Sequence, residues 1–299
     1  EMYKIIGPGA GISTYSVEGD ENLEGYRSIT LPGTAIGLCT AHKLMGKLPL
    51  DQVMEPAIHL AQYGFDVYWL LTLMIGGSMQ GIQRFAASRE VFLPQGYPPR
   101  YLPDPSSADQ ATDRLVQRDL AEVLKRISRF GSPGLYEGEI ATAIEQDMKQ
   151  NGGLITRLDL ASYRPAVRMP LAVRFRDYKM LAPTAPCGSW TALETLNLLE
   201  NFDLRSMGHN SINHLHTFIE GSRHSFADRY RYLGDPDFVD VPLNALLSKE
   251  YAREVVGQID LSHACVEDLS EEQPWTYFEE RALHDPWKHE GKVGPVPPL

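Results

Sequence analysis

Apolar residues recur three and four positions apart through most of the chain, and several of these runs end at a glycine. This spacing puts the apolar side chains on one face of a helix, and glycine commonly ends a helix. Gly46 and Gly64, for example, close the first two runs. The pattern predicts helices over Ala35–Met45, Leu50–Tyr63, Leu115–Ser128, Gly138–Asn151, Trp190–Glu200, Ser211–Tyr232 and Asn244–Gln258.

The pattern changes from helical to alternating after Ala166. Every second residue between Val167 and Phe175 is apolar, and Asp177–Leu181 follows after a short turn. Such alternation is typical of half-buried strands, so we expect two paired strands here. We expect an irregular or strand-like lead-in over Glu1–Ile29 and a proline-rich loop over Pro94–Ser107. The chain is therefore predicted to be mostly helical with a few strands, in the α+β class.

Length and composition narrow the possible classes of protein. A chain of 299 residues with 43% hydrophobic content can bury a substantial core, as one large domain or two ordinary ones. We take residues 1–299 as a single domain. The net charge of -11, without clustered Lys and Arg, argues against nucleic-acid binding. Since no apolar run reaches eighteen residues, we expect no membrane span.

The two ends of the chain carry separate expectations. Glu1 stands where a methionine would begin a chain, so we expect that upstream residues have been lost by processing or truncation. An export signal could have been among them, which leaves the compartment open between cytoplasmic and exported. The tail over residues 265–299 is acidic and finally proline-rich, and we expect it to be flexible.

Three cysteines, Cys39, Cys187 and Cys265, fit no known cysteine framework. Their wide spacing excludes a CxxC metal or redox site, and their odd number does not suit a set of disulfides. We expect mostly buried thiols.

The most suggestive group of potential metal ligands comprises His209, His214, His216, Glu220 and His224. The last three are four residues apart, which aligns them on one helix face. The HExxH spacing of helix-borne zinc sites is absent, and no further ligand is indicated. We interpret these residues as structural or surface side chains and expect no metal.

The glycine-rich segment Gly7–Gly11 suggests a phosphate-binding loop only superficially. The Lys-Ser or Lys-Thr pair of a P-loop does not follow it, and no buried strand precedes it. We therefore expect no organic cofactor.

Two further positions could carry chemistry. Ser189 stands on a turn before a predicted helix, where some hydrolases expose a nucleophile, but the GxSxG frame is absent and a helix N-cap is the preferred interpretation. The carboxylates Asp228, Asp235 and Asp237 beside Arg229 could serve acid–base chemistry or calcium. We interpret them as ion pairs and caps. The residues alone thus indicate no self-contained active site.

Several motifs, taken in order, resemble those of the γ-glutamyltranspeptidase family. LPGTAIGL at Leu31–Leu38 is similar to the family's LPGTVAGL. The resemblance continues almost to Asp260 through GKLP at 46–49, PAIHLA at 56–61, GF at 64–65, LYEGEIA at 135–141, NGGLIT at 151–156, DLASY at 159–163, FADR at 226–229 and LGDPDFV at 233–239.

One segment departs from the family's pattern. Where the family has PPPSSGG, this chain has PTAPCGS at Pro183–Ser189, which suggests a diverged branch. The family's upstream glycine-rich segment and the arginine that holds the donor's α-carboxylate would precede Glu1.

The resemblance implies an N-terminal-nucleophile (Ntn) hydrolase with an αββα four-layer sandwich. This chain would be the large-subunit portion and would contribute a few strands to the shared sheets. A precursor would cut itself beyond Leu299 and free an N-terminal Thr on the small subunit, whose α-amine can activate the hydroxyl. The expected partners are that small subunit and a small-molecule amide, with a dimer of such pairs as a larger assembly. We therefore expect no catalytic residue in this chain.

Three functional hypotheses follow. The leading one is cleavage or transfer of a γ-glutamyl group through an acyl-enzyme on the partner's Thr. Within enzymes, the alternative is an amidohydrolase, acylase or natural-product biosynthetic enzyme that acts on a non-glutamyl substrate. From another class, the alternative is a helical scaffold without catalysis.

Overall fold

The computed structural model describes residues 3–8, 15–103, 112–264 and 284–290. The chain divides into two compact units. Unit 1 comprises Glu1–Ile6 and Val17–Ala166, and unit 2 comprises Gly7–Ser16 and Val167–Leu299. The expectation of one domain over residues 1–299 stays a prediction. None of the described helices is long and apolar enough to cross a membrane.

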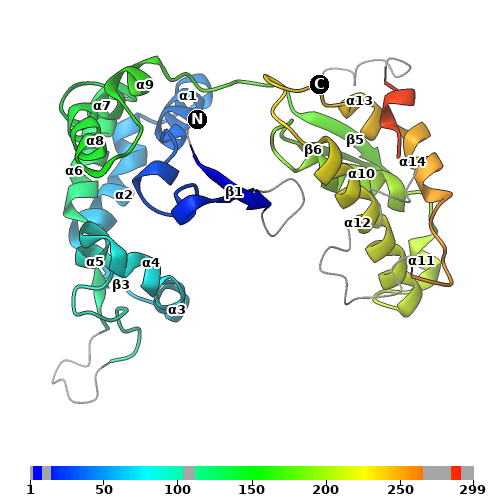
Figure 1. Cartoon of the computed structure of the whole chain (residues 1–299), viewed down its shortest axis with the longest axis horizontal. Coiled ribbons are helices and arrows are strands. Elements are labelled where there is room, and N and C mark those ends of the chain that lie inside the picture. The colour runs from blue at the N-terminus through cyan, green and yellow to red at the C-terminus, as the bar shows by residue number, and fades with distance from the viewer. Residues whose placement is uncertain (1–2, 9–14, 104–111, 265–283, 291–299) are drawn as a thin grey trace. The chain divides into compact units, whose positions relative to one another are not determined.

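Unit 1 is built mainly from helices (Figure 1). They are α1 (Gly33–Met45), α2 (Leu50–Tyr63), α3 (Trp69–Gly77), α4 (Met79–Arg84), α5 (Ala86–Phe92), α6 (Arg118–Phe130), α7 (Pro133–Tyr136), α8 (Gly138–Asn151) and α9 (Arg157–Ser162), with the short 3-10 helices η1 (Glu18–Asp20) and η2 (Tyr26–Ser28). Strands β3 (Phe65–Asp66) and β4 (Arg114–Leu115) pair antiparallel. Near the start of the chain, β1 (Ile5–Pro8) and β2 (Tyr15–Val17) form another two-stranded sheet, which neither unit contains as a whole.

The predicted helices of unit 1 are confirmed to within a few residues. The helix predicted from Leu115 begins instead at Arg118, because Leu115 pairs with Phe65 in the β3–β4 ladder. The apolar residues from Trp69 to Ile75 belong to α3, which was not predicted. Helices α4, α5, α7 and α9 were not predicted.

The N-terminus of α1 is capped by a tyrosine that lies far away in the sequence. Pro32 precedes the helix and supplies no side-chain cap. The buried Tyr136 hydroxyl instead accepts a hydrogen bond from the Ile36 N–H at 3.1 Å and donates one to the Pro32 carbonyl. Gly33 packs beside it, where a Cβ atom would lie 2.6 Å from the Tyr163 hydroxyl. The LPGT, LYEG and DLASY motifs therefore meet at one point of unit 1.

A second motif, NGGLIT with DLASY, forms the start of α9. The Thr156 hydroxyl accepts a hydrogen bond from the Asp159 N–H at 3.2 Å, and the Asp159 carboxylate accepts one from the Thr156 N–H at 2.9 Å. The Thr156 hydroxyl also donates to the Asp159 carboxylate at 2.6 Å, and this hydrogen bond, followed by the one from the Thr156 N–H, lowers the pKa of Asp159. Such a reciprocal capping box satisfies two of the unpaired N–H groups at a helix start. This motif is thus a folding signal.

Unit 2 packs helices onto a β-hairpin. Its elements are β5 (Leu171–Phe175), β6 (Tyr178–Ala182), α10 (Trp190–Leu199), α11 (Leu204–Met207), α12 (Ile212–Tyr232), α13 (Leu243–Leu246), α14 (Lys249–Val256) and η3 (Pro286–Lys288). The strands pair antiparallel, from Leu171 opposite Ala182 to Phe175 opposite Tyr178. Helix α10 contacts β5, α12 and α14 (Figure 1). Its fully buried Trp190 belongs to the core of unit 2.

Two predictions in unit 2 need correction. The first strand begins at Leu171, because Pro170 precedes it and Val167 and Met169 are exposed. The segment predicted as one helix over Asn244–Gln258 is two helices, α13 and α14. The Ser248 hydroxyl between them accepts the Tyr251 N–H at 3.1 Å and so starts a new helix.

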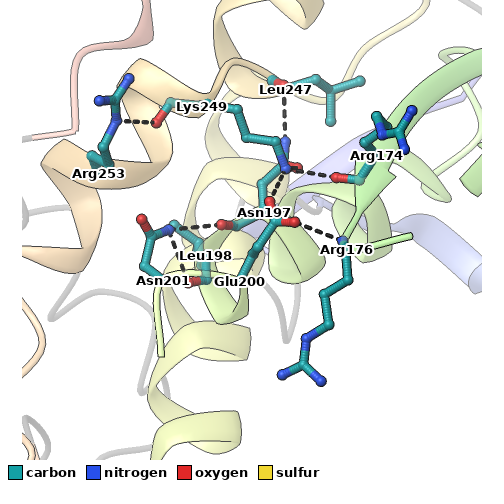
Figure 2. Close-up of polar contacts among 9 residues, drawn as sticks. All are labelled: Arg174, Arg176, Asn197, Leu198, Glu200, Asn201, Leu247, Lys249 and Arg253. Atoms are coloured by element: carbon teal, nitrogen blue, oxygen red, sulfur yellow. Dashed lines mark hydrogen bonds and ion pairs between the residues drawn. The ribbon is translucent and has the colours of Figure 1, made fainter. Parts of the chain in front are cut away.

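A polar cluster around Lys249 joins the hairpin to α10 and α14 (Figure 2). The Lys249 ammonium donates to the Arg174 carbonyl and to the Asn197 Oδ1 atom, both at 2.7 Å, and also to Glu200. The fully buried Asn197 in turn donates from Nδ2 to the Leu247 carbonyl at 2.8 Å. The Glu200 carboxylate also accepts the N–H of Arg176 in the hairpin turn at 2.6 Å. These bonds hold three elements at a fixed spacing.

Tyr136→Phe should destabilise α1. The change leaves the buried Ile36 N–H without an acceptor, which typically costs about 1–3 kcal/mol. Native-state hydrogen exchange of the α1 amides in a urea series measures this loss. Tyr26→Phe is the matched control, because its hydroxyl makes only a 3.4 Å exposed hydrogen bond to Asp147. Equal effects of the two changes would contradict the capping role.

Asn197→Leu should destabilise unit 2 by about 2–3 kcal/mol, because the buried Leu247 carbonyl and the Lys249 ammonium each lose a partner. Hydrogen exchange of the α10 amides provides the measurement. In the control variant Asn201→Ala, an exposed side chain is lost that donates only to carbonyls at the end of α10. We expect the control to cost less than about 1 kcal/mol.

Candidate functional site

A buried carboxylate lies at the centre of unit 2. Asp228 on α12 is 1% exposed. Its Oδ2 atom accepts a hydrogen bond from the Tyr251 hydroxyl at 2.6 Å, and its Oδ1 atom lies 2.8 Å from Nδ1 of His284. Burial and the nearby Asp228 charge raise the pKa of Tyr251, so this phenol stays protonated and keeps donating.

A second carboxyl group, Glu194 on α10, faces Asp228 and is fully buried. Neither of its oxygens has a hydrogen-bond donor among the described residues. Burial and the Asp228 charge raise the pKa of Glu194 well above its usual value. These effects favour the protonated form of Glu194, whose proton can be donated to Asp228.

Two histidine rings extend this cluster. Nδ1 of His224 lies 2.8 Å from Nε2 of His284, and the rings stack with centroids 4.9 Å apart. Both rings are buried. Burial, and then the neighbouring His284, lower the pKa of His224 to about 4. At neutral pH His224 is thus uncharged, and it can donate to His284, which donates to Asp228.

The geometry of the buried cluster does not suit catalysis. Its members are between 0% and 5% exposed, so a substrate cannot reach them. The nearby Ser225 hydroxyl donates to the Gly221 carbonyl and so is not linked to a histidine. The interpretation of Asp228 as an ion-pair or capping residue beside Arg229 needs correction, because its partners are Tyr251 and His284.

Sequence reasoning missed Glu194, Tyr251 and His284. A signal existed for Glu194, because it is a charged residue on the apolar helix Trp190–Leu199. No comparable signal marked His284, which lies 56 residues beyond Asp228.

The predicted group of histidines does not converge on a metal site. Nε2 of His216 hydrogen-bonds the Asp260 carbonyl at 2.8 Å, and Glu220 pairs with Arg223 at 2.8 Å. His209 and His214 lie together, with ring centroids 6.2 Å apart. Within the described ranges, no three His, Cys, Asp or Glu side chains form a group that could hold a metal ion.

The Pro183–Ser189 turn leads directly into the start of α10. Ser189 occupies the N-cap position of α10, as predicted, but its side chain makes no capping hydrogen bond. The Ser189 hydroxyl donates instead to the Pro183 carbonyl at 3.0 Å, and it lies 3.3 Å from the Cys187 sulfur. The peptide bond between Ala185 and Pro186 is cis.

The cysteine prediction is corrected at this turn. Cys187 is exposed and Cys39 is only half-buried, while Cys265 lies outside the described residues. Hydrogen bonds from Ser189, with a smaller contribution from the Arg229 charge, lower the pKa of the Cys187 thiol.

Arg229 on α12 lies against this turn. Its guanidinium occupies the space beside Gly188, where a Cβ atom would lie 2.5 Å from Nη1. It also lies over the Phe226 ring, 5.6 Å from the centroid. In the part of the chain that the structure describes, no hydrogen bond links Cys187 or Ser189 to a histidine or carboxylate. The turn therefore presents a thiol, a hydroxyl and a cation for contact with a ligand, without a nucleophile–base pair.

The other candidates named from the sequence either make local contacts or lie largely outside the described residues. Asp235 accepts the Asp237 N–H at 3.0 Å, and Asp237 pairs with Arg168 at 3.2 Å, so the interpretation as caps and ion pairs is confirmed for these two. Of the glycine-rich segment Gly7–Gly11, only Gly7 and Pro8 are described. The predicted flexible tail lies outside the described residues except for 284–290.

A cleft of about 610 Å³ opens in unit 1. It lies between α1, the α6–α7 junction and α9, and its wall includes Cys39, Lys43, Tyr136 and Arg164. Arg164 donates to the Ala161 and Tyr163 carbonyls, both at 2.8 Å. Burial raises the pKa of Cys39, which therefore remains a thiol at neutral pH.

Known proteins resemble this chain in both sequence and fold. The glutathione hydrolase proenzyme of Escherichia coli (strain K12) is 36% identical over 247 residues, which cover 82% of this chain and 41% of that protein. The Acylase ACY 1 proenzyme of Pseudomonas sp. (strain SE83) is 34% identical over 265 residues, which cover 88% of this chain and 46% of that protein. The chain thus spans less than half the length of these curated relatives.

Among solved structures, Helicobacter pylori gamma-glutamyltranspeptidase superposes with a TM-score of 0.75 at 29% identity, covering 90% of this chain and 75% of that one. The cephalosporin acylase from Bacillus halodurans superposes with a TM-score of 0.71 at 26% identity, covering 79% of this chain and 43% of that one. The fold is thus that of the γ-glutamyltranspeptidase-like Ntn hydrolases, in a mostly helical chain with a few short strands. The family model described as Gamma-glutamyltranspeptidase matches residues 9–291, and this chain belongs to that family.

Proposed function

We propose that this chain is the large-subunit portion of an Ntn amidase or acyltransferase whose nucleophile is the N-terminal Thr of a small subunit from the same precursor. The observation that carries the proposal is the family match over residues 9–291 in a chain that spans 41% of a proenzyme relative. The described residues offer groups for binding rather than a nucleophile joined to a base.

The proposed reaction begins at the small subunit. The α-amine of the Thr takes the proton of its own hydroxyl, and the oxygen attacks the carbonyl carbon of the amide. Backbone N–H groups of the small subunit stabilise the oxyanion. The amine leaves with a proton, and the acyl-enzyme is released by water in hydrolysis or by an acceptor amine in transfer.

In this proposal, the contribution of unit 2 is to form part of the substrate pocket. The Pro183–Ser189 turn joins the fully buried Trp190 directly, so the position of the turn is set by the core. Cys187, Ser189 and Arg229 would then face the part of the substrate that distinguishes one acyl group from another. Side chains that bind a substrate need such rigid support to keep their positions.

Exposed apolar side chains support a large partner surface. In unit 1 they include Leu38 at 66%, Met45 at 76% and Trp69 at 59% exposure. Large apolar groups in such numbers commonly mark an interface. An isolated two-stranded hairpin such as β5–β6 is only marginally stable, which favours its extension by strands of the small subunit into the shared sheets of an αββα sandwich.

A second candidate function is acylase activity on a substrate without the γ-glutamyl amino group. The PTAPCGS sequence of the turn and the 34% identity to an acylase proenzyme favour it. The third hypothesis, a scaffold without catalysis, predicts no processing at all.

The complete precursor, incubated with γ-glutamyl anilide and with glutaryl anilide, separates these functions. The two substrates differ only in the α-amino group. If the precursor is processed and releases aniline mainly from the γ-glutamyl substrate, the first function is supported; preference for the glutaryl substrate supports the acylase. If the precursor neither yields a chain that begins with Thr nor releases aniline, both enzymatic proposals are wrong.

Gly188→Ala tests the role of the turn in selecting the substrate. The added methyl group displaces the flexible end of Arg229, so we expect little loss of stability. For the preferred anilide we expect kcat/KM to fall about tenfold, which corresponds to about 1.4 kcal/mol of transition-state binding. Gly37→Ala is the matched control, because a Cβ atom there meets nothing within 4 Å. An unchanged kcat/KM in Gly188→Ala would exclude the turn from the pocket.

A further inference from the structure

Residues 284–290 fold back onto α12, α13 and α14, and we call this segment the strap. The Tyr232 hydroxyl donates to the His284 carbonyl at 3.1 Å, and Nε2 of His289 lies 2.7 Å from a Glu254 oxygen. The Tyr251 ring contacts both histidines edge-on, with centroid distances of 6.3 and 5.8 Å. This described part of the predicted flexible tail is therefore packed.

The strap also completes a helix that cannot cap itself. Pro242 precedes α13 and supplies no side-chain cap. The Glu290 carboxylate accepts the Ala245 N–H at 3.0 Å and the Asn244 side-chain amide at 3.1 Å. A carboxylate at a helix start satisfies an unpaired N–H and interacts favourably with the helix dipole. The docked strap and α13 therefore stabilise each other.

The contact between the His224 and His284 rings can accommodate only a limited number of protons. The 2.8 Å contact between Nδ1 of His224 and Nε2 of His284 needs one hydrogen between the two nitrogens. One additional proton is accommodated, because His284 as an imidazolium can donate to both Asp228 and His224. A second additional proton puts N–H groups on both facing nitrogens, and the hydrogen bond is replaced by repulsion.

Titratable groups from every packed element surround the histidine pair. Among the described residues, the Asp228 carboxylate lies 2.8 Å from Nδ1 of His284, whereas the buried Glu220 is paired with Arg223 at 2.8 Å. The groups are Glu194 on α10, Glu220, Asp228 and Tyr232 on α12, Tyr251 and Glu254 on α14, and Asp285, Lys288, His289 and Glu290 on the strap. A single negative charge can balance one imidazolium but not two.

We propose that the strap is a proton-sensitive latch, docked while the His224–His284 pair carries at most one additional proton and released when a second proton enters. The proposal rests on the packing of unit 2 and is independent of the reaction proposed above.

The direction of the pH effect follows from His224. Burial lowers its pKa from the ordinary 6.5 to about 4, so the docked state resists protonation that the released state accepts. Docking is therefore strongest above pH 6.5 and weakens as the pH falls towards 4. In this window the docking equilibrium falls by up to about tenfold per pH unit.

Hydrogen exchange of the full chain at pH 7.0 and pH 4.5, corrected for intrinsic exchange rates, tests the latch. We expect the strap amides to lose more than tenfold in protection at pH 4.5 while the α10 amides keep theirs. His224→Gln retains a hydrogen-bond donor without a titrating group, so its strap should stay protected at pH 4.5. His289→Gln is the matched control and should keep the pH dependence of the unaltered chain.

Three outcomes would overturn the latch. The first is that the strap of His224→Gln loses as much protection at pH 4.5 as the strap of the unaltered chain. The second is that the α10 amides lose protection together with the strap. The third is that the strap of the unaltered chain remains protected at pH 4.5. If His224→Gln does not fold, NMR titration of the histidine rings in the unaltered chain replaces it. There, charging of His224 must coincide with strap release, and a His224 that charges while the strap stays docked contradicts the proposal.

Discussion

The negative charge of Asp228 has to be balanced inside unit 2, and much of that unit is arranged around this requirement. A buried carboxylate without compensation costs several kcal/mol. Its compensation comes from three separate segments: Tyr251 on α14, His284 on the strap and the protonated Glu194 on α10. These segments surround α12 because each supplies a donor or a proton that the carboxylate requires. The buried cluster thereby links helices that are far apart in the sequence.

In unit 1, buried polar groups at the start of a helix are satisfied by a neutral side chain. Helix α1 begins after a proline without a cap of its own, and the Tyr136 hydroxyl satisfies both the Ile36 N–H and the Pro32 carbonyl. Gly33 allows Tyr163 to approach the same point. Motifs that identify the family therefore include residues that hold helix ends together. Their presence indicates the fold, and the chemistry has to be argued from other groups.

Local patterns predicted the elements well where the deciding forces are local. The 3.6-residue periodicity located α1, α2 and α8, and alternation located the β5–β6 hairpin. One failure occurred where a distant residue decides, since Leu115 is a strand residue because Phe65 lies opposite. The other had a local cause that apolar periodicity does not reveal: the predicted helix over 244–258 breaks at Ser248, which caps α14. Of the candidate site, the Pro183–Ser189 departure was visible in the sequence, whereas the position of Arg229 beside Gly188 depends on tertiary packing.

Two neighbouring residues on α12 lie in different environments. Asp228 is part of the buried cluster, and Arg229 lies against the exposed turn. The turn can therefore change its side chains without disturbing the balance of charge in the interior. Over evolutionary time, such a separation lets mutations accumulate at the turn at little cost to folding. A branch of the family can then explore new ligands on a helical frame that stays constant, and the PTAPCGS sequence is the kind of variation that this frame tolerates.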